Sequence, residues 1–349
     1  MPFAWSRGRQ DIVRSKRQPP LVLTAHDVFQ EDGSPSGVEA NIAVGAETLT
    51  KTLKNLRNRG YTFVGFAEFI ERRHDGNVAL LTFDDAYRSV SRVALPVLKA
   101  EAVPAVVFVV TGTLFDNADP FPIWLQALRD RKSILEEAAA ASLLSDRAIR
   151  RVITKSGFAT LAELLSRPLG IPTEAFRQTL TQGDLDEIAA AVAALPGIGK
   201  MTMTEADIRQ LMSSGLVELG AHSVSHRSFA MLADQEIEEE IAGSVAMVAE
   251  LSGKLPSLLP FAYPYGAVTA RAAHYISRTC RAGFTCHARP ITRLDPVATL
   301  PRVNLDGNAI RNCGSGSLAT HLLALTREKM HLHLRSRLAK FAQVGSILR

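Results

Sequence analysis

Short, continuous apolar runs alternate with amphipathic stretches in the first third of the chain. Leu21–Ala25, Val78–Phe83 and Ala105–Val110 are apolar along almost their whole length. Between the first two, Ala46–Arg59 repeats its leucines with a helical period and is followed by Gly60, a residue type that commonly ends helices. Strands that are apolar throughout are typical of a sheet covered on both faces. The pattern therefore predicts an α/β fold with mostly parallel strands.

The pattern changes in the middle of the chain and then returns. Residues 116–200 are rich in alanine and leucine, with helical spacing and few strand signals, so we expect a helical insertion there. The alternation resumes with a helix over Thr204–Ser213 and a strand over Leu216–Gly220. Further short strands are predicted over Tyr61–Val64, Ser257–Ala262, Ala282–Cys286 and Thr299–Val303. The last segment, His321–Leu348, is predicted to be helical.

Length and composition narrow the class of protein. A chain of 349 residues allows one large domain or two ordinary ones, and 46% hydrophobic with 21% charged residues is typical of a globular protein. No apolar run approaches the roughly 18 residues of a membrane-spanning helix, and Met1–Arg17 lacks the apolar core of a secretory signal. Three cysteines without paired spacing fit a reducing compartment. We therefore expect a cytoplasmic protein.

The positive charge is concentrated at the two ends. Residues 1–19 hold five basic residues and one acidic residue, and residues 311–349 hold seven basic and one acidic. Because the whole chain carries +5, the part between them is net negative. Such tails favour either solubility or peripheral contact with an anionic membrane surface. No nucleic acid partner is expected, because the basic segments are not interleaved with aromatic residues, which make up only 6% of the chain.

Three polar clusters stand directly after predicted apolar strands. They are Asp84-Asp85, the segment His222–His226 and the segment Tyr263–Gly266. The carboxyl ends of parallel strands share one face of an α/β fold, so these clusters can converge. The aspartate pair alone could simply cap the following helix. Two adjacent carboxylates beside apolar residues otherwise need a cation or another partner to stay charged.

The histidines add a second interpretation. His222 and His226 are four residues apart, which suits two imidazoles on one metal if the turn between them is helical. One carboxylate with two imidazoles is the ligand set of a catalytic divalent ion such as zinc, with positions left for water and substrate. One aspartate would then be a metal ligand and its neighbour a base, which accounts for the need for two acids.

These residues carry a resemblance to a known family. Thr82-Phe83-Asp84-Asp85, His222–His226 and Phe261–Gly266 resemble, in order, the first three motifs of the polysaccharide deacetylase family, also called the NodB-homology fold or carbohydrate esterase family 4. The resemblance implies a distorted (β/α) barrel over residues 20–115 and 201–312. Residues 1–19, 116–200 and 313–349 would be a basic tail, the helical insertion and a basic helical segment.

The family's site residues can be placed on this sequence by its motifs. Asp84 resembles the catalytic base, and Asp85, His222 and His226 resemble the metal ligands. Tyr265 matches the residue whose backbone N–H helps hold the oxyanion that develops during the reaction. The resemblance implies a divalent metal, with Zn2+ first and Co2+ or Ni2+ as alternatives. It also implies an N-acetylated carbohydrate as the substrate.

The chain also departs from the family pattern. The arginine that often opens the third motif is absent, as are the later Leu-x-His motif and the tryptophan of the fourth. His26, just after the first predicted strand, is our candidate for the general acid, since it resembles the Tyr-His-Asp segment of the poly-N-acetylglucosamine deacetylase branch. Asp27 could orient its ring, and His287 is the reserve acid. Arg302 or Asp306 could tune the base.

Three functions are consistent with these residues. The first is a metal-dependent hydrolase that removes N-acetyl groups from an amino-sugar glycan or oligosaccharide. The second is a metal-dependent amidase that acts on a non-sugar amide. The third is a degenerate barrel that binds carbohydrate or a partner without catalysis. The missing arginine and Leu-x-His motif favour it, and the intact Asp84, Asp85, His222 and His226 weigh against it.

Overall fold

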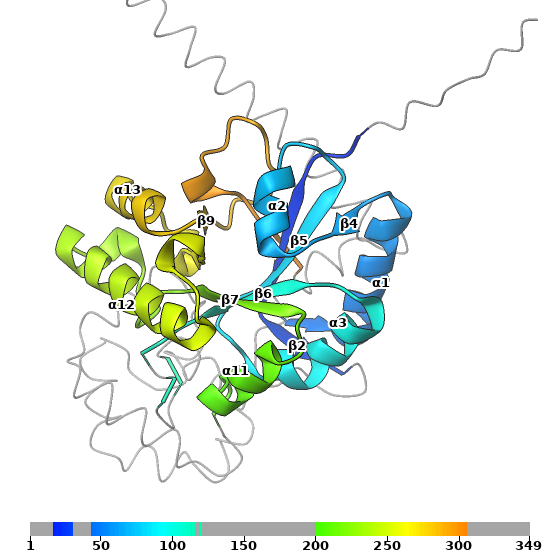
Figure 1. Ribbon diagram of the computed structural model, residues 1–349, viewed down its shortest axis with the longest axis horizontal. Helices are drawn as coiled ribbons and strands as arrows, with labels where there is room; N and C mark the ends of the chain where they lie inside the picture. The colour runs from blue at the N-terminus through cyan, green and yellow to red at the C-terminus, as the bar shows by residue number, and fades with distance from the viewer. Residues whose placement is uncertain (1–16, 31–42, 113, 116–118, 121–199, 306–349) are drawn as a thin grey trace, which may run out of the picture.

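The computed structural model describes residues 17–30, 43–112, 114–115, 119–120 and 200–305 (Figure 1). The predicted helical insertion and both basic tails lie almost entirely outside these residues, as does Asp306. The domain boundaries at these segments therefore remain predictions. In the described part of the chain, no helix has the length and apolar character needed to cross a membrane.

A parallel sheet forms the centre of the molecule. Its strands run in the order β10-β1-β5-β6-β7-β8-β9, and β4 also pairs with β5. Strands β1 and β5 are joined over the whole length of β1, with Leu23 opposite Leu81. The bounds of these strands are β1 Leu21–Ala25, β4 Thr62–Phe63, β5 Val78–Phe83, β6 Ala105–Val109, β7 Val217–Ala221, β8 Pro260–Ala262, β9 Ala282–Phe284 and β10 Val303–Asn304.

The segment from residue 300 to residue 304 closes this sheet into a barrel. At its start, Leu300 forms a parallel bridge with Phe284 of β9. Three residues later, Val303 of β10 pairs with Leu23 of β1, at the other end of the strand order. One short segment therefore connects β9 with β1. The architecture is the distorted (β/α) barrel expected from the sequence.

Strands β1, β5, β6 and β8 each contribute to two separate apolar cores. In β5, Leu80 packs in a cluster with Val22, Val106 and Phe108 of the neighbouring strands, whereas Leu81 belongs to the cluster that the outer helices cover. Both faces of the strands are therefore buried, which is why their sequences are apolar without alternation. The first cluster includes residues of helix α2, Phe66–Arg72.

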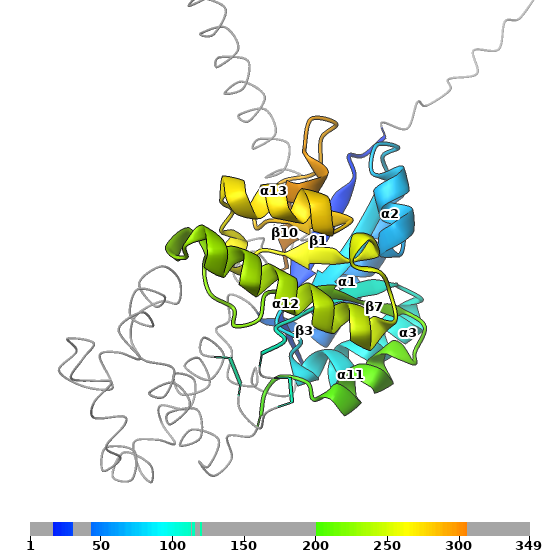
Figure 2. The same ribbon diagram turned by 60° about the vertical axis from the view of Figure 1, so that its left-hand side comes forward.

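Helices cover the outside of the barrel. Helices α12 and α13 lie together on one side, and α1 and α3 lie on the other (Figures 1 and 2). The Thr204 side chain begins helix α11 by accepting a hydrogen bond from the Asp207 N–H, and the Asp207 carboxylate accepts one from the Thr204 N–H. The helix bounds are α1 Ala46–Asn58, α3 Leu95–Glu101, α11 Glu205–Met212, α12 Asp234–Ser252 and α13 Ala270–Thr279.

Most of the predicted elements are present, with some changes. The strand expected over residues 299–303 is shorter and begins later, as β10 at Val303–Asn304, because Val297–Thr299 form a 3-10 turn. A similar turn at Pro256–Leu258 delays the start of β8 to Pro260. The sequence interpretation did not include α2, α12 and α13, nor the small parallel pair β2 (Asp27–Phe29) and β3 (Ala43–Gly45).

Candidate active site

The predicted site residues meet at the carboxyl ends of the strands. Asp84 and Asp85 follow β5, His222 follows β7, and His26 follows β1. Backbone hydrogen bonds extend the strand pairing into this region, since the Asp84 N–H donates to Ala25 O at 2.9 Å and the His222 N–H to Val109 O at 3.0 Å. Backbone hydrogen bonds of the sheet therefore hold Asp84 and His222 in position independently of their side-chain contacts.

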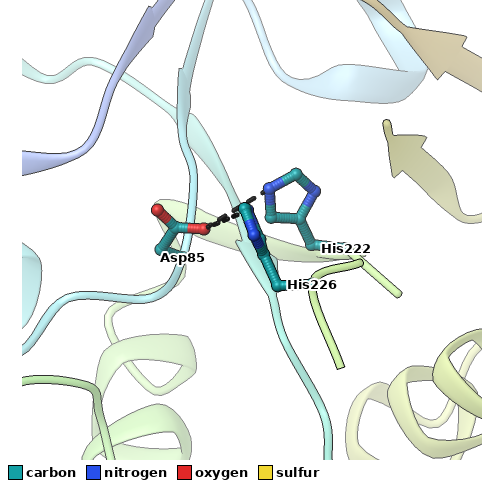
Figure 3. A group of neighbouring side chains, drawn as sticks. All are labelled: Asp85, His222 and His226. Atoms are coloured by element: carbon teal, nitrogen blue, oxygen red, sulfur yellow. Dashed lines mark ion pairs between the residues drawn. The ribbon is translucent and has the colours of Figure 1, made fainter. Parts of the chain in front are cut away.

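Asp85, His222 and His226 form a buried group with the character of a metal site. The Nε2 atoms of His222 and His226 lie 3.4 and 3.1 Å from Asp85 Oδ1. Figure 3 shows both rings directed toward the same carboxylate oxygen. The candidate ligand atoms all lie within 4.8 Å of one another. One divalent ion could thus be reached by all three side chains.

The contacts of this group require a positive charge between the imidazole rings and the carboxylate. Nδ1 of His222 lies 2.8 Å from the carbonyl oxygen of Ala262, which can only accept, so this nitrogen carries the proton. In the neutral ring, Nε2 then presents a lone pair to Asp85 Oδ1, a buried atom that accepts no hydrogen bond of ordinary geometry from the described residues. Two lone pairs face each other stably only if a proton or a metal ion lies between them, and metal-bound histidines commonly make this kind of carbonyl contact.

The histidines and aspartates of this group shift one another's pKa values toward the charged forms. Burial by itself would raise the pKa of Asp85, but His226 and His222 outweigh it and hold this pKa well below its usual value. Burial lowers the pKa of His222, whereas the facing Asp85 carboxylate, the charge of Asp84 and the Ala262 carbonyl raise it, and the net direction is upward. The pocket therefore stabilises an ionised Asp85 and attracts positive charge.

Asp84 takes a different partner from its neighbour. Arg302 Nη1 donates to Asp84 Oδ1 and Nη2 to Oδ2, both at 2.7 Å. The guanidinium also donates from Nε to Thr285 O at 3.1 Å, and it lies over the ring of Phe108. Burial would raise the pKa of Asp84, but Arg302 and, to a lesser degree, His222 lower it below its usual value. Asp84 is thus an ionised carboxylate beside the candidate metal-binding group.

His26 lies on the other side of Asp84. Its Nε2 is 3.9 Å from Asp84 Oδ2, and 17% of its side chain remains exposed, so the ring lies close to this carboxylate and is still partly accessible. Burial lowers the pKa of His26, and this outweighs the opposite effect of Asp84 and Asp85. The ring is therefore mainly neutral at neutral pH. Its Nδ1 has no hydrogen-bond partner among the described residues, so Asp27 does not hold the ring through this atom.

Tyr265 reaches the same site from the loop after β8. Its backbone is left-handed, with φ 55° and ψ 11°, within the turn Pro264–Gly266. The side chain packs edge-on against the ring of His226, with the ring centroids 4.7 Å apart. Gly266 follows with φ +67°, and a Cβ there would lie 2.7 Å from the backbone nitrogen of Cys286. The turn is thus tightly fitted beside the two histidines.

Two local arrangements considered in the sequence analysis are not found in the structure. The turn between His222 and His226 is not helical, because Ser223 and His226 are both left-handed, with φ 64° and 57°. Neither aspartate acts as a helix cap: Asp84 is paired with Arg302, and Asp85 faces the two histidines.

The structure also places two further residues named from the sequence and adds one that was missed. His287, the reserve acid, is exposed, and its ring is hydrogen-bonded to Thr285. Arg302 was one of two residues considered as partners of the base, and its two hydrogen bonds to Asp84 now single it out. Glu240, which contacts the segment between the histidines, was missed, because helix α12 itself was not predicted.

Comparison with known structures shows the same fold. A polysaccharide deacetylase from Bacillus cereus is similar with a TM-score of 0.52 and 14% identity, over 88% of this chain and 69% of that one. The protein IcaB from Ammonifex degensii gives a TM-score of 0.52 and 19% identity, over 86% and 97% of the two chains. A Streptococcus pyogenes deacetylase solved with acetate gives 0.50 and 15%, over 84% and 93%.

The sequence itself identifies the family. No curated protein matches the chain significantly. The family model described as polysaccharide deacetylase, however, matches residues 71–141 and 177–284, which together are just over half of the chain. The matched residues include the aspartate pair, both histidines and the turn that contains Tyr265. The chain therefore belongs to the polysaccharide deacetylase family.

Proposed function

We propose that this protein is a metal-dependent hydrolase that removes N-acetyl groups from an amino-sugar glycan or oligosaccharide. The observation that carries the proposal is the division between the two neighbouring aspartates. Asp85 faces two imidazole nitrogens at 3.4 and 3.1 Å, whereas Asp84 is held apart by Arg302 at 2.7 Å. Hydrolysis of an amide needs both an electrophilic centre and a base. Asp85 would help to hold the metal ion that is the electrophile, and Asp84 would be the base.

Asp85, His222 and His226 would hold a divalent ion, and we propose Zn2+. When bound, such an ion polarises the amide carbonyl and makes water easier to deprotonate. The residues fit it because one carboxylate and two imidazoles leave coordination positions for water and substrate. The bond from His222 Nδ1 to Ala262 O, 2.8 Å long, orients that ring and leaves its Nε2 available.

Asp84 would act as the base that accepts the proton of the attacking water. Its low pKa, which Arg302 maintains against the effect of burial, keeps it ionised at neutral pH. The two bonds from Arg302 also fix the plane of the carboxylate, so that its position does not depend on substrate. A fixed base reduces the reorganisation that proton transfer requires.

His26 would protonate the departing amine. Because burial keeps this ring mainly neutral, the proton that it delivers must be gained during the reaction. Asp84, 3.9 Å from His26 Nε2, would hold that proton after taking it from water. The backbone N–H of Tyr265 would donate to the oxygen on which negative charge develops.

Acetate release from an N-acetylglucosamine oligomer tests this function. The wild-type protein, freed of metal and then given Zn2+, is compared with Asp84→Asn and His222→Ala. We expect Asp84→Asn to retain the ion and lose roughly 100-fold or more in kcat, the usual effect of removing a catalytic base. His222→Ala should lose both the ion and activity. Release of an acyl group from a non-sugar amide alone would favour the amidase, and metal binding without any hydrolysis would contradict the enzyme.

A further inference from the structure

The loop that carries the two histidines has a backbone that needs support. This histidine loop, residues 222–226, contains two left-handed residues that are not glycine, Ser223 with φ 64° and His226 with φ 57°. Such conformations are unfavourable for residues other than glycine and persist only where the surroundings impose them. They bring both Nε2 atoms to the same oxygen of Asp85. The ring positions therefore depend on whatever holds this turn.

Glu240 of helix α12 holds one side of the histidine loop. Its Oε2 accepts hydrogen bonds from the N–H groups of Val224 at 2.9 Å and Ser225 at 2.8 Å. Its Oε1 accepts from the Ser225 hydroxyl. An ionised carboxylate only accepts hydrogen bonds, and it makes stronger ones than a neutral group does. One side chain thus binds three donors located between the two histidines.

The end of strand β6 holds the opposite side. The Thr111 N–H donates to Ser223 O at 3.2 Å, and the Gly112 N–H donates to Val224 O at 2.7 Å. The fit is close, since a Cβ on Gly112 would lie 2.6 Å from Val224 O. The loop is therefore clamped between a strand end, which donates to its carbonyls, and a helix carboxylate, which accepts from its amides.

We propose that Glu240 is a positioning residue for the metal site, an inference that rests on the proposed function. The carboxylate stabilises the left-handed turn, and the turn sets the distance between the two imidazoles and Asp85. A variant without the Glu240 carboxylate still contains all three ligand residues, but its histidine loop can relax toward ordinary backbone conformations. Residues that orient metal ligands in this way typically contribute 10–100-fold to metal affinity.

The dissociation constant of Zn2+, measured on the metal-free full-length chain against a competing chelator, tests this role. Glu240→Ala should weaken binding roughly 10–100-fold. Glu240→Gln keeps the size but places one NH2 group where an oxygen accepted, so it should have a smaller effect in the same direction. Glu239→Gln, on the exposed face of the same helix, is the matched control and should bind like the wild type.

A second measurement separates positioning from general stability. The visible absorption of bound Co2+ reports the ligand geometry, and we expect Glu240→Gln to change it at saturating Co2+ while Glu239→Gln does not. Zn2+ affinities of both Glu240 variants within about twofold of the wild type would overturn the inference. A wild-type chain that binds no divalent ion would overturn the proposed metal site and, with it, the role of Glu240.

Discussion

Arg302 and Asp84 form a doubly hydrogen-bonded ion pair inside the candidate active site, with both N–O distances 2.7 Å. The two residues are 218 positions apart in the chain and meet because the segment before β10 closes the barrel next to β1 and β5. The chain lacks the arginine that often opens the third family motif, yet a guanidinium reaches the site from another segment. The proposed base therefore has a fixed cationic partner.

Removal of this partner should shift the pH dependence of activity. In Arg302→Met, the pKa of Asp84 rises, because the largest effect opposing burial is lost. Activity that needs ionised Asp84 should then appear only at higher pH, so the acidic limb of the kcat/KM profile shifts to higher pH. Loss of one partner of a buried pair also destabilises a protein, typically by about 3–5 kcal/mol. Arg302→Lys keeps a charge and should shift the limb less.

Exposed Arg271 provides the control for this experiment. Arg271→Met should leave the profile unchanged. An acidic limb that stays in place in both Arg302 variants, while they remain folded by circular dichroism, would show that Arg302 does not control the protonation of the base.

The role of His26 can be tested through the leaving group. A general acid helps the departure of an amine, which must be protonated, but helps little with the phenolate of 4-nitrophenyl acetate. We expect His26→Gln to reduce acetate release from an N-acetylglucosamine oligomer roughly 100-fold and to affect the ester much less. Equal losses for the two substrates would argue against an acid role. A selective loss in His287→Gln instead would move the assignment to His287.

A buried ion pair that is not among the proposed catalytic and metal-binding residues predicts how the stability of the fold depends on pH. Arg289 donates two hydrogen bonds to Asp295, at 2.7 and 2.6 Å, and the Thr292 N–H donates a third at 2.7 Å. Burial would raise the pKa of Asp295, but these bonds lower it below its usual value of 3.8. The stabilisation is therefore complete above that value and is lost as the pH falls through the lower, folded-state pKa.

Urea unfolding of Asp295→Asn should show this difference. At pH 6 the variant should be less stable than the wild type by about 1.5–3 kcal/mol, as is typical for hydrogen bonds to a charged group. The gap should narrow below pH 4. Glu47→Gln, which removes an exposed pair with Lys51, should change stability by only a few tenths of a kcal/mol at either pH. A gap for Asp295→Asn that is independent of pH would contradict the assignment.

The sequence pattern predicts the centre of this fold better than its periphery. Strands such as Val78–Phe83 are apolar on both faces, and a short run of this kind between turn residues is typical of a strand in a covered parallel sheet. Helix α12 was not predicted; in it, buried positions such as Ile237 and Ile241 are interspersed with a run of charged residues. Strands of two or three residues, such as β2, are too short for periodicity to indicate.

The same contrast applies to the site. The aspartates and histidines were found because their residue types, their positions directly after apolar strands and their resemblance to the family motifs all point to a metal site. Glu240 carries no such signal, since a glutamate on a charged helix is usually solvated, and only the fold brings it to Val224 and Ser225. The non-helical turn was missed for a related reason: left-handed Ser223 depends on contacts made from other parts of the chain.

The metal content of the purified chain tests the central claim most directly. After exposure to Zn2+ and dialysis, elemental analysis should find about one ion per wild-type chain and almost none in Asp85→Ala and His222→Ala. Asp84→Asn should retain its ion, because this carboxylate is bound to Arg302 rather than directed at the histidines. A wild-type chain without zinc, or an unchanged zinc content in Asp85→Ala and His222→Ala, would contradict the account.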